Sequence, residues 1–132
     1  MGTKTVADKL LIRPATTIWF SNKSRLNLVG PLPDGVRVVD RLEDATTAVL
    51  FADDAASARD ILAANKGGLT AADVFWVAYP KANRTDINRD SLWPILSEHG
   101  MRPISQVAID DVWSALRFRV LREGEAPFTG GQ

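Results

Sequence analysis

One apolar run constrains the fold of this chain more than any other stretch. Residues 74–79 read Val-Phe-Trp-Val-Ala-Tyr and are rich in β-branched and aromatic side chains. A strand without polar alternation must be covered on both faces, so the run predicts a central strand in a sheet flanked by helices. Pro80 cannot donate a ladder hydrogen bond and is expected to end the strand.

The size and composition are typical of a small globular protein. The chain has 132 residues, of which 45% are hydrophobic, and this is enough for one hydrophobic core but not for two. We expect a single domain over residues 1–121, in which residues 1–9 form a flexible lead-in. Residues 122–132 are rich in glycine and are expected to form a loose tail.

Charge and residue usage exclude several classes of function. The 16 basic residues balance the 16 acidic ones, so the sequence predicts neither a nucleic-acid partner nor a membrane surface. The chain has no cysteine, which excludes disulfides and thiolate sites. No signal peptide or long apolar segment is present, so we expect a cytoplasmic protein.

Further strands alternate with helical patterns along the chain. The expected strands cover residues 16–20, 36–39, 47–52, 101–109 and 113–121. This order predicts an α/β fold with a small, doubly wound, mostly parallel sheet that ends in an antiparallel hairpin. It resembles a trimmed Rossmann-like fold of the methyltransferase type, a likeness that by itself carries no function.

One connection and one strand leave the details of this sheet open. Only residues 40–46 link the second and third strands, which is too short for a crossover helix between parallel neighbours. We favour a link that is extended or forms a single turn. The alternative is an antiparallel second strand. In residues 113–121 the apolar Leu116 and Phe118 alternate with Arg117 and Arg119. Such alternation favours a solvent-facing, antiparallel edge strand.

The turn after the first strand argues against a bound cofactor. Dinucleotide and methyl-donor binders need glycines there, so that the backbone can approach the ligand. This chain has Ser21-Asn22-Lys23-Ser24-Arg25 and no glycine before Gly30. No cofactor is therefore expected in the usual position. The single histidine, His99, has no second histidine or cysteine beside it, so no metal site is expected either.

The polar segment after residues 74–79 is the first candidate site, because α/β sheets bind ligands beyond the carboxyl ends of their strands. Lys81, Arg84 and Arg89 could hold a small anion, with Asn88 as a neutral donor. The alternative is a solvated loop in which these cations pair with Asp86 and Asp90.

A second block, Asp111 to Arg117, is expected at the same end of the sheet. There Arg117 could approach Asp111 or Asp86, and Trp113 could either cover the edge of the sheet or line a cleft. Together the two blocks give the candidate ligand-binding residues Lys81, Arg84, Asp86, Asn88, Arg89, Asp111, Trp113, Ser114 and Arg117.

Several motifs resemble one known family. WVAYPK at residues 76–81, DINRD at 86–90, VAIDDVWSALRFR at 107–119 and GPLPDGVRVV at 30–39 are similar to an uncharacterised bacterial family, domain of unknown function 3052. The likeness covers roughly residues 8–121 and implies a small intracellular α/β domain without a known reaction. The family pattern implies Pro-Gly before the first strand, where this chain has Pro14-Ala15. If that turn needs a positive φ, Ala15 is strained or the turn differs.

Three functions are consistent with these observations. The first is a non-catalytic domain that binds a small anion at the loop after residues 74–79. The second is a protein-interaction module or homodimer that associates through the C-terminal edge strand. The third, a divergent methyltransferase-like enzyme, has no nucleophile, metal set or cofactor turn to support it, so an enzyme is the less favoured class.

Overall fold

The computed structural model describes residues 6–30, 32–65, 68, 72–81, 86–87 and 89–120, without the side chain of Arg89. Of the predicted flexible lead-in at residues 1–9, residues 1–5 lie outside this part of the chain, as does the predicted tail at residues 122–132. So do two candidate site residues, Arg84 and Asn88. Within the lead-in, residues Val6–Lys9 instead form a short helix whose Ala7 is buried, because that side chain packs into the core.

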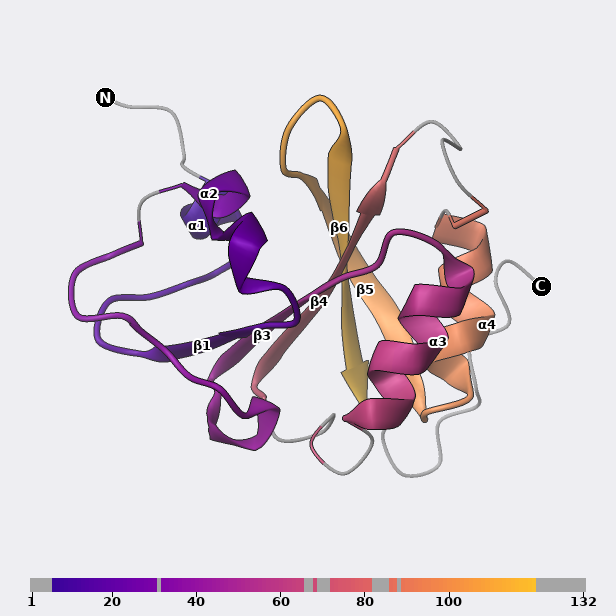
Figure 1. Ribbon diagram of the computed structural model, residues 1–132, viewed down its shortest axis with the longest axis horizontal. Coiled ribbons are helices and arrows are strands. Elements are labelled where there is room, and N and C mark those ends of the chain that lie inside the picture. Colours follow the sequence, from indigo (N-terminus) through magenta and orange to yellow (C-terminus); the bar gives the residue numbers. More distant parts are fainter. Residues whose placement is uncertain are drawn as a thin grey trace.

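The fold is α/β, as the sequence predicts, and consists of one mixed parallel and antiparallel sheet with helices on both faces (Figure 1). Its six strands follow the order β2-β1-β3-β4-β6-β5. The strands are β1 (Thr17–Phe20), β2 (Arg37–Val38), β3 (Thr47–Phe51), β4 (Val74–Pro80), β5 (Met101–Ala108) and β6 (Trp113–Val120). The helices are α1 (Val6–Lys9), η1 (Lys23–Arg25), α2 (Leu26–Val29), η2 (Leu42–Asp44), α3 (Ala55–Ala64) and α4 (Arg89–Ser97).

The central strand behaves as its composition requires. β4 pairs in parallel with β3 on one side and antiparallel with β6 on the other, and Phe75 to Pro80 are all buried. Its alternate side chains serve two cores. Phe75, Val77 and Tyr79 pack beneath α3 and α4, while Trp76 and Ala78 pack beneath α1 and α2. The indole nitrogen of Trp76 donates to the Leu10 carbonyl at 2.9 Å, which ties the segment after α1 to the sheet.

The second strand is parallel to the first, so the short link to the third strand is the favoured single turn and not the alternative antiparallel arrangement. β2 pairs in parallel with β1, in the register Thr17 with Arg37. A single 3-10 turn, η2, then leads back to β3 on the other side of β1. No crossover α-helix is needed, because the single turn of η2, with extended backbone at Arg41 and Ala45 on either side of it, spans the distance.

The expectation of an edge strand at the C-terminal end is wrong. β6 lies between β4 and β5, and β5 is the edge strand. The alternation of Arg117 and Arg119 has a different cause. Arg117 shares a sheet face with Trp113 and Ala115, which are buried in the core under α1 and α2. Arg117 itself is only partly covered and lines a pocket.

The turn before β1 contains the strain that the sequence predicts. Ala15 has a φ of 61°, a conformation that favours glycine. Its backbone nitrogen donates to the Asp34 carbonyl at 2.9 Å, and a Cβ atom on Gly35 would come within 3.3 Å of the Ala15 Cα. The turn at Ala15 and the turn at Asp34 and Gly35 thus pack against each other, backbone to backbone. Leu11 also has a positive φ, of 64°, where the chain leaves α1.

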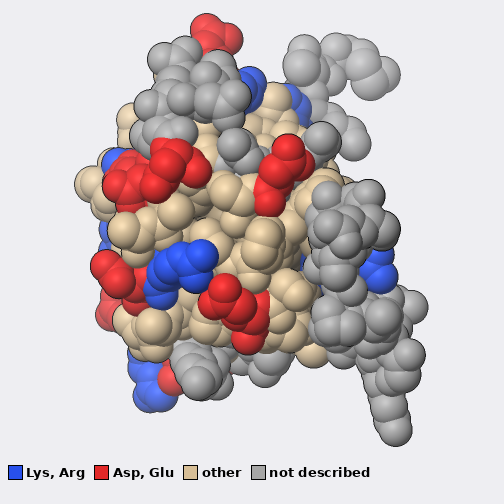
Figure 2. Space-filling view, turned by 90° about the vertical axis from the view of Figure 1, so that its right-hand side faces the viewer, with Lys and Arg blue, Asp and Glu red and all other residues tan. Residues whose placement is uncertain are grey.

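Surface charges are mixed on the face that carries α3 and α4, where acidic and basic side chains are scattered among uncharged ones (Figure 2). Within the described ranges, none of the helices has the length and apolar character that a membrane span requires.

Candidate functional site

The strand order places the candidate site at the carboxyl ends of β1 and β3. The chain runs outward from β1 to β2 and then returns to β3 on the opposite side of β1. In open α/β sheets, ligands bind outside the strand ends at the point where the order reverses in this way. We call this position the switch point. It is built from Ser21 to Arg25 after β1, Asp40 after β2 and Asp53 after β3.

The turn after β1 is held by its own polar side chains. The Phe51 backbone nitrogen donates to the Ser21 hydroxyl at 2.7 Å, which fastens the ends of β1 and β3 to each other. Asn22 caps η1 by accepting hydrogen bonds from the Ser24 nitrogen at 3.1 Å and the Ser24 hydroxyl at 2.6 Å. Side-chain oxygens therefore satisfy this turn, where glycines would leave backbone nitrogens open to a ligand.

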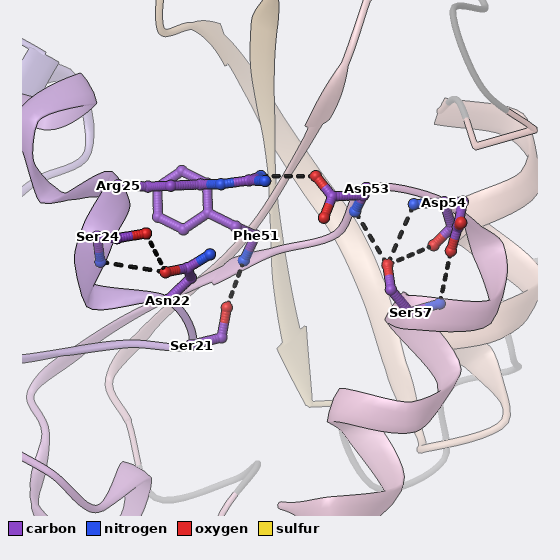
Figure 3. Close-up of polar contacts among 8 residues, drawn as sticks. All are labelled: Ser21, Asn22, Ser24, Arg25, Phe51, Asp53, Asp54 and Ser57. Carbon is purple, nitrogen blue, oxygen red and sulfur yellow. Dashed lines mark hydrogen bonds and ion pairs between the residues drawn. The ribbon is translucent and has the colours of Figure 1, made fainter.

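Arg25 crosses the switch point. Its guanidinium lies 2.7 Å from a carboxylate oxygen of Asp53, 6.0 Å from the Phe51 ring centroid and 4.6 Å from the Trp113 ring centroid. Figure 3 shows the side chain passing the Phe51 ring on its way to Asp53. The Nη1 atom is buried but makes no aligned hydrogen bond, so the contact is an ion pair supported by cation–π attraction.

A second ion pair joins Lys23 to Asp40. Both side chains are exposed, with 84% of the Asp40 side chain open to solvent. The hydrogen bond from Lys23, with its positive charge, lowers the pKa of the Asp40 carboxyl below its ordinary value. Each of the two acids beside the switch point is thus neutralised by a cation from the turn after β1.

The amino end of α3 is closed by carboxylates. Asp54 accepts from the Ser57 nitrogen at 2.8 Å and forms a capping box with that serine. Asp86, one of the predicted ligand-binding residues, accepts from the Ala55 nitrogen at 2.8 Å. The nitrogens at this helix end therefore face acids of the protein itself. Asp86 has a structural role in this arrangement, and ligand binding by Asp86 stays a prediction.

The two predicted blocks meet at one end of the sheet, with one exception. The Lys81 nitrogen donates to the Val112 carbonyl at 2.7 Å, and Pro80 pairs with Trp113. Lys81, Asp111, Trp113 and Ser114 therefore share the end near the switch point. Arg117 pairs with Trp76 farther along the sheet and lines a pocket with Asp73. Its predicted approach to Asp111 or Asp86 is wrong, because four residues of strand separate it from that end.

Two residues of the second block have roles that the sequence did not indicate. Trp113 is buried and packs edge-on against Phe51, with the ring centroids 5.6 Å apart. It neither covers a sheet edge nor lines a described cleft. Ser114 is also buried; its hydroxyl donates to the Val107 carbonyl and accepts from Gln106, which also donates to the Tyr79 hydroxyl.

The switch-point residues were missed in the sequence, although one signal was available. In dinucleotide-binding folds an acidic residue about 20 positions after the first turn holds the ribose hydroxyls. Asp40 has this spacing from the end of β1 and lies two residues beyond the end of β2. The turn after β1 lacks glycine, and for that reason the sequence predicted no ligand site at this end of β1.

Comparison with known proteins gives matches in structure only. No protein-family model and no curated protein matches the chain. An uncharacterised protein of Listeria monocytogenes superimposes with a TM-score of 0.59 at 14% identity, over 97% of this chain and 72% of the other. A putative tRNA (m1A22) methyltransferase of Streptococcus pneumoniae, in complex with S-adenosyl-L-methionine, gives 0.53 at 13%, over 92% and 72%.

A third similar structure is the magnesium protoporphyrin IX methyltransferase of Synechocystis with bound SAH. It gives a TM-score of 0.54 at 7% identity, over 88% of this chain and 80% of the other. At these identities the likeness establishes the Rossmann-like fold that the sequence predicts.

These matches also correct the functional prediction. The prediction of a non-catalytic domain that binds an anion at the loop after β4 is contradicted, because methyltransferases recur among the similar structures.

Proposed function

We propose that this chain is a divergent methyltransferase-like domain that binds an adenosyl ligand of the S-adenosylmethionine class at the switch point. The observation that carries the proposal is the coincidence of strand order and acidic residues. The order β2-β1-β3 creates the switch point, and the exposed carboxylates of Asp40 and Asp53 lie at the strand ends that flank it.

The side chains at the switch point fit such a ligand better than the backbone does. Carboxylates accept hydrogen bonds from ribose hydroxyls, the role for which Asp40 has the spacing. Asp53 would face the positively charged end of the ligand, beside the aromatic rings of Phe51 and Trp113. The turn after β1 has no glycine, so the ligand would contact the side chains of Ser21 and Asn22 where other folds offer bare backbone.

Lys23 and Arg25 compete for the same two acids. Their side chains would have to turn away before a ligand could reach Asp40 and Asp53. Both ion pairs are at least partly exposed, and solvent screens pairs of this kind, so they contribute little to stability. Binding energy from an adenosyl ligand is large enough to displace them. When bound, such a ligand would supply an electrophilic methyl group, and the residues named here would bind and orient it.

Isothermal titration calorimetry with S-adenosylmethionine, SAH and adenosine tests the proposal. Saturable binding is expected in the wild type, together with about tenfold weaker binding in Asp40→Asn, since tenfold corresponds to about 1.4 kcal/mol. Asp60→Asn, which changes an exposed acid on α3, should bind as the wild type does. If neither the wild type nor Arg25→Ala bound any adenosyl compound, the proposal would be overturned.

A further inference from the structure

A pocket of about 320 Å³ opens near the amino ends of β3 and β4, away from the switch point. It lies on the side of the sheet that α1 and α2 cover, where Thr47 and Val74 stand side by side in neighbouring strands. The polar residues that line it are Arg13, Thr16, Thr46, Thr47, Asp73 and Arg117. The volume is at the lower end of the range for small-molecule sites, which is roughly 300–1,000 Å³.

Arg117 is the unusual member of this set. Its Nε atom is buried and has no hydrogen-bond partner within the described part of the chain. Asp73 lines the same pocket, yet no ion pair joins the two side chains. A guanidinium nitrogen that is shielded from water without gaining an acceptor is costly, so such atoms normally meet an anion or ordered water.

The surroundings supply further donors for an anion. Arg13 brings a second guanidinium from the exposed segment before β1, and Thr46 and Thr47 bring hydroxyl groups. Two arginines against one aspartate leave the lining with an excess positive charge. Guanidinium groups bind carboxylates and phosphates through paired hydrogen bonds. The walls thus match a small molecule with one compact oxyanion and room for hydroxyl or apolar atoms beside Leu11 and Val74.

We propose that this pocket binds a small metabolite that carries a carboxylate or phosphate group, with Arg117 and Arg13 as its anchors. The site is distinct from the loop after β4. It is also distinct from the switch point, because Arg117 stands four residues along β6 from Trp113, on the order of 13 Å at 3.3 Å per residue. The proposal does not depend on binding of an adenosyl ligand.

The test uses inorganic phosphate and succinate as probes, at constant ionic strength with chloride as the reference anion. Saturable binding to the wild type is expected by calorimetry, together with a rise in Tm of several degrees. Arg117→Gln should weaken the binding at least tenfold. Arg117→Lys keeps the charge but loses the paired geometry, so its loss should be smaller. Stronger binding of phosphate or of succinate assigns the kind of oxyanion.

Two further variants make the result interpretable. Arg13 is exposed, so Arg13→Gln should fold normally and still weaken binding, even if Arg117→Gln does not fold. Arg59→Gln, which changes an exposed cation on α3, should bind as the wild type does. Asp40→Asn should also leave this site unchanged, which separates it from the switch point. The proposal is overturned if neither probe binds saturably, or if Arg13→Gln and Arg117→Gln bind as tightly as the wild type.

Discussion

The guanidinium of Arg25 lies 4.6 Å from the centroid of the Trp113 ring, and so joins the turn after β1 to the first residue of β6. The same guanidinium pairs with Asp53 after β3. One side chain therefore connects the ends of two parallel strands with the start of an antiparallel one.

Replacement of Arg25 should measure the strength of this connection. Arg25→Ala removes a cation–π contact and a partly exposed ion pair, and we expect the free energy of unfolding to fall by about 1–2 kcal/mol. Arg59→Ala removes an exposed pair with Glu98 and should cost at most about 0.5 kcal/mol. Urea unfolding of both variants provides the comparison, and equal losses would mean that Arg25 contributes no more than a surface cation.

The strained turn before β1 predicts a stabilising substitution. Ala15 has a φ of 61°, so Ala15→Gly should relieve strain and raise the free energy of unfolding by about 0.5–1 kcal/mol, even after the added flexibility of the unfolded chain. Ala56→Gly, on the exposed face of α3, should instead lower it by about 0.5–1 kcal/mol. Thermal unfolding of the two variants should move Tm in opposite directions, and a fall in both would show that the Ala15 turn carries no relievable strain.

Asp86 should behave as a helix cap. It accepts a hydrogen bond from the first residue of α3, so Asp86→Ala should cost about 1 kcal/mol of stability. The exposed Asp111 makes no side-chain hydrogen bond or ion pair with another described residue, and Asp111→Ala should stay within about 0.5 kcal/mol of the wild type. A larger loss at Asp111 than at Asp86 would contradict these assignments.

The pair between Lys23 and Asp40 makes a prediction about pH. The pKa of the folded Asp40 carboxyl lies below its ordinary value because Lys23 donates to it. The pairing therefore favours the folded state above the ordinary carboxyl pKa and stops doing so as the pH falls through the lowered folded value. In Lys23→Met the pKa of Asp40 should rise toward its ordinary value, as an NMR titration of the side-chain carboxyl would show. An unchanged pKa would mean that the two side chains are not paired in solution.

Much of the fold could be predicted from local pattern. The apolar run at residues 74–79 became the buried β4, because the burial of a strand on both faces follows from residues that are near one another in sequence. The strained Ala15 could be anticipated from a family resemblance that itself stays a prediction.

The order of the strands could not be predicted in the same way. The arginines of β6 suggested a solvent-facing edge strand, but β6 lies inside the sheet and Arg117 is only partly exposed, on the face that holds the buried Trp113 and Ala115. The site was misplaced for a related reason. The switch point exists because β2 and β3 pair with opposite sides of β1. The sequence of a single strand does not determine which strands it pairs with.

The position of β6 has a consequence for synthesis on the ribosome. β4 and β5 are made before the strand that must lie between them. Until residues 113–120 emerge, β4 has one open side and β5 has no partner in the sheet. A nascent chain stalled before that point would expose strand backbone to other chains. Release of β6 is thus the step that closes the sheet, and truncation before it should produce aggregates rather than a smaller folded unit.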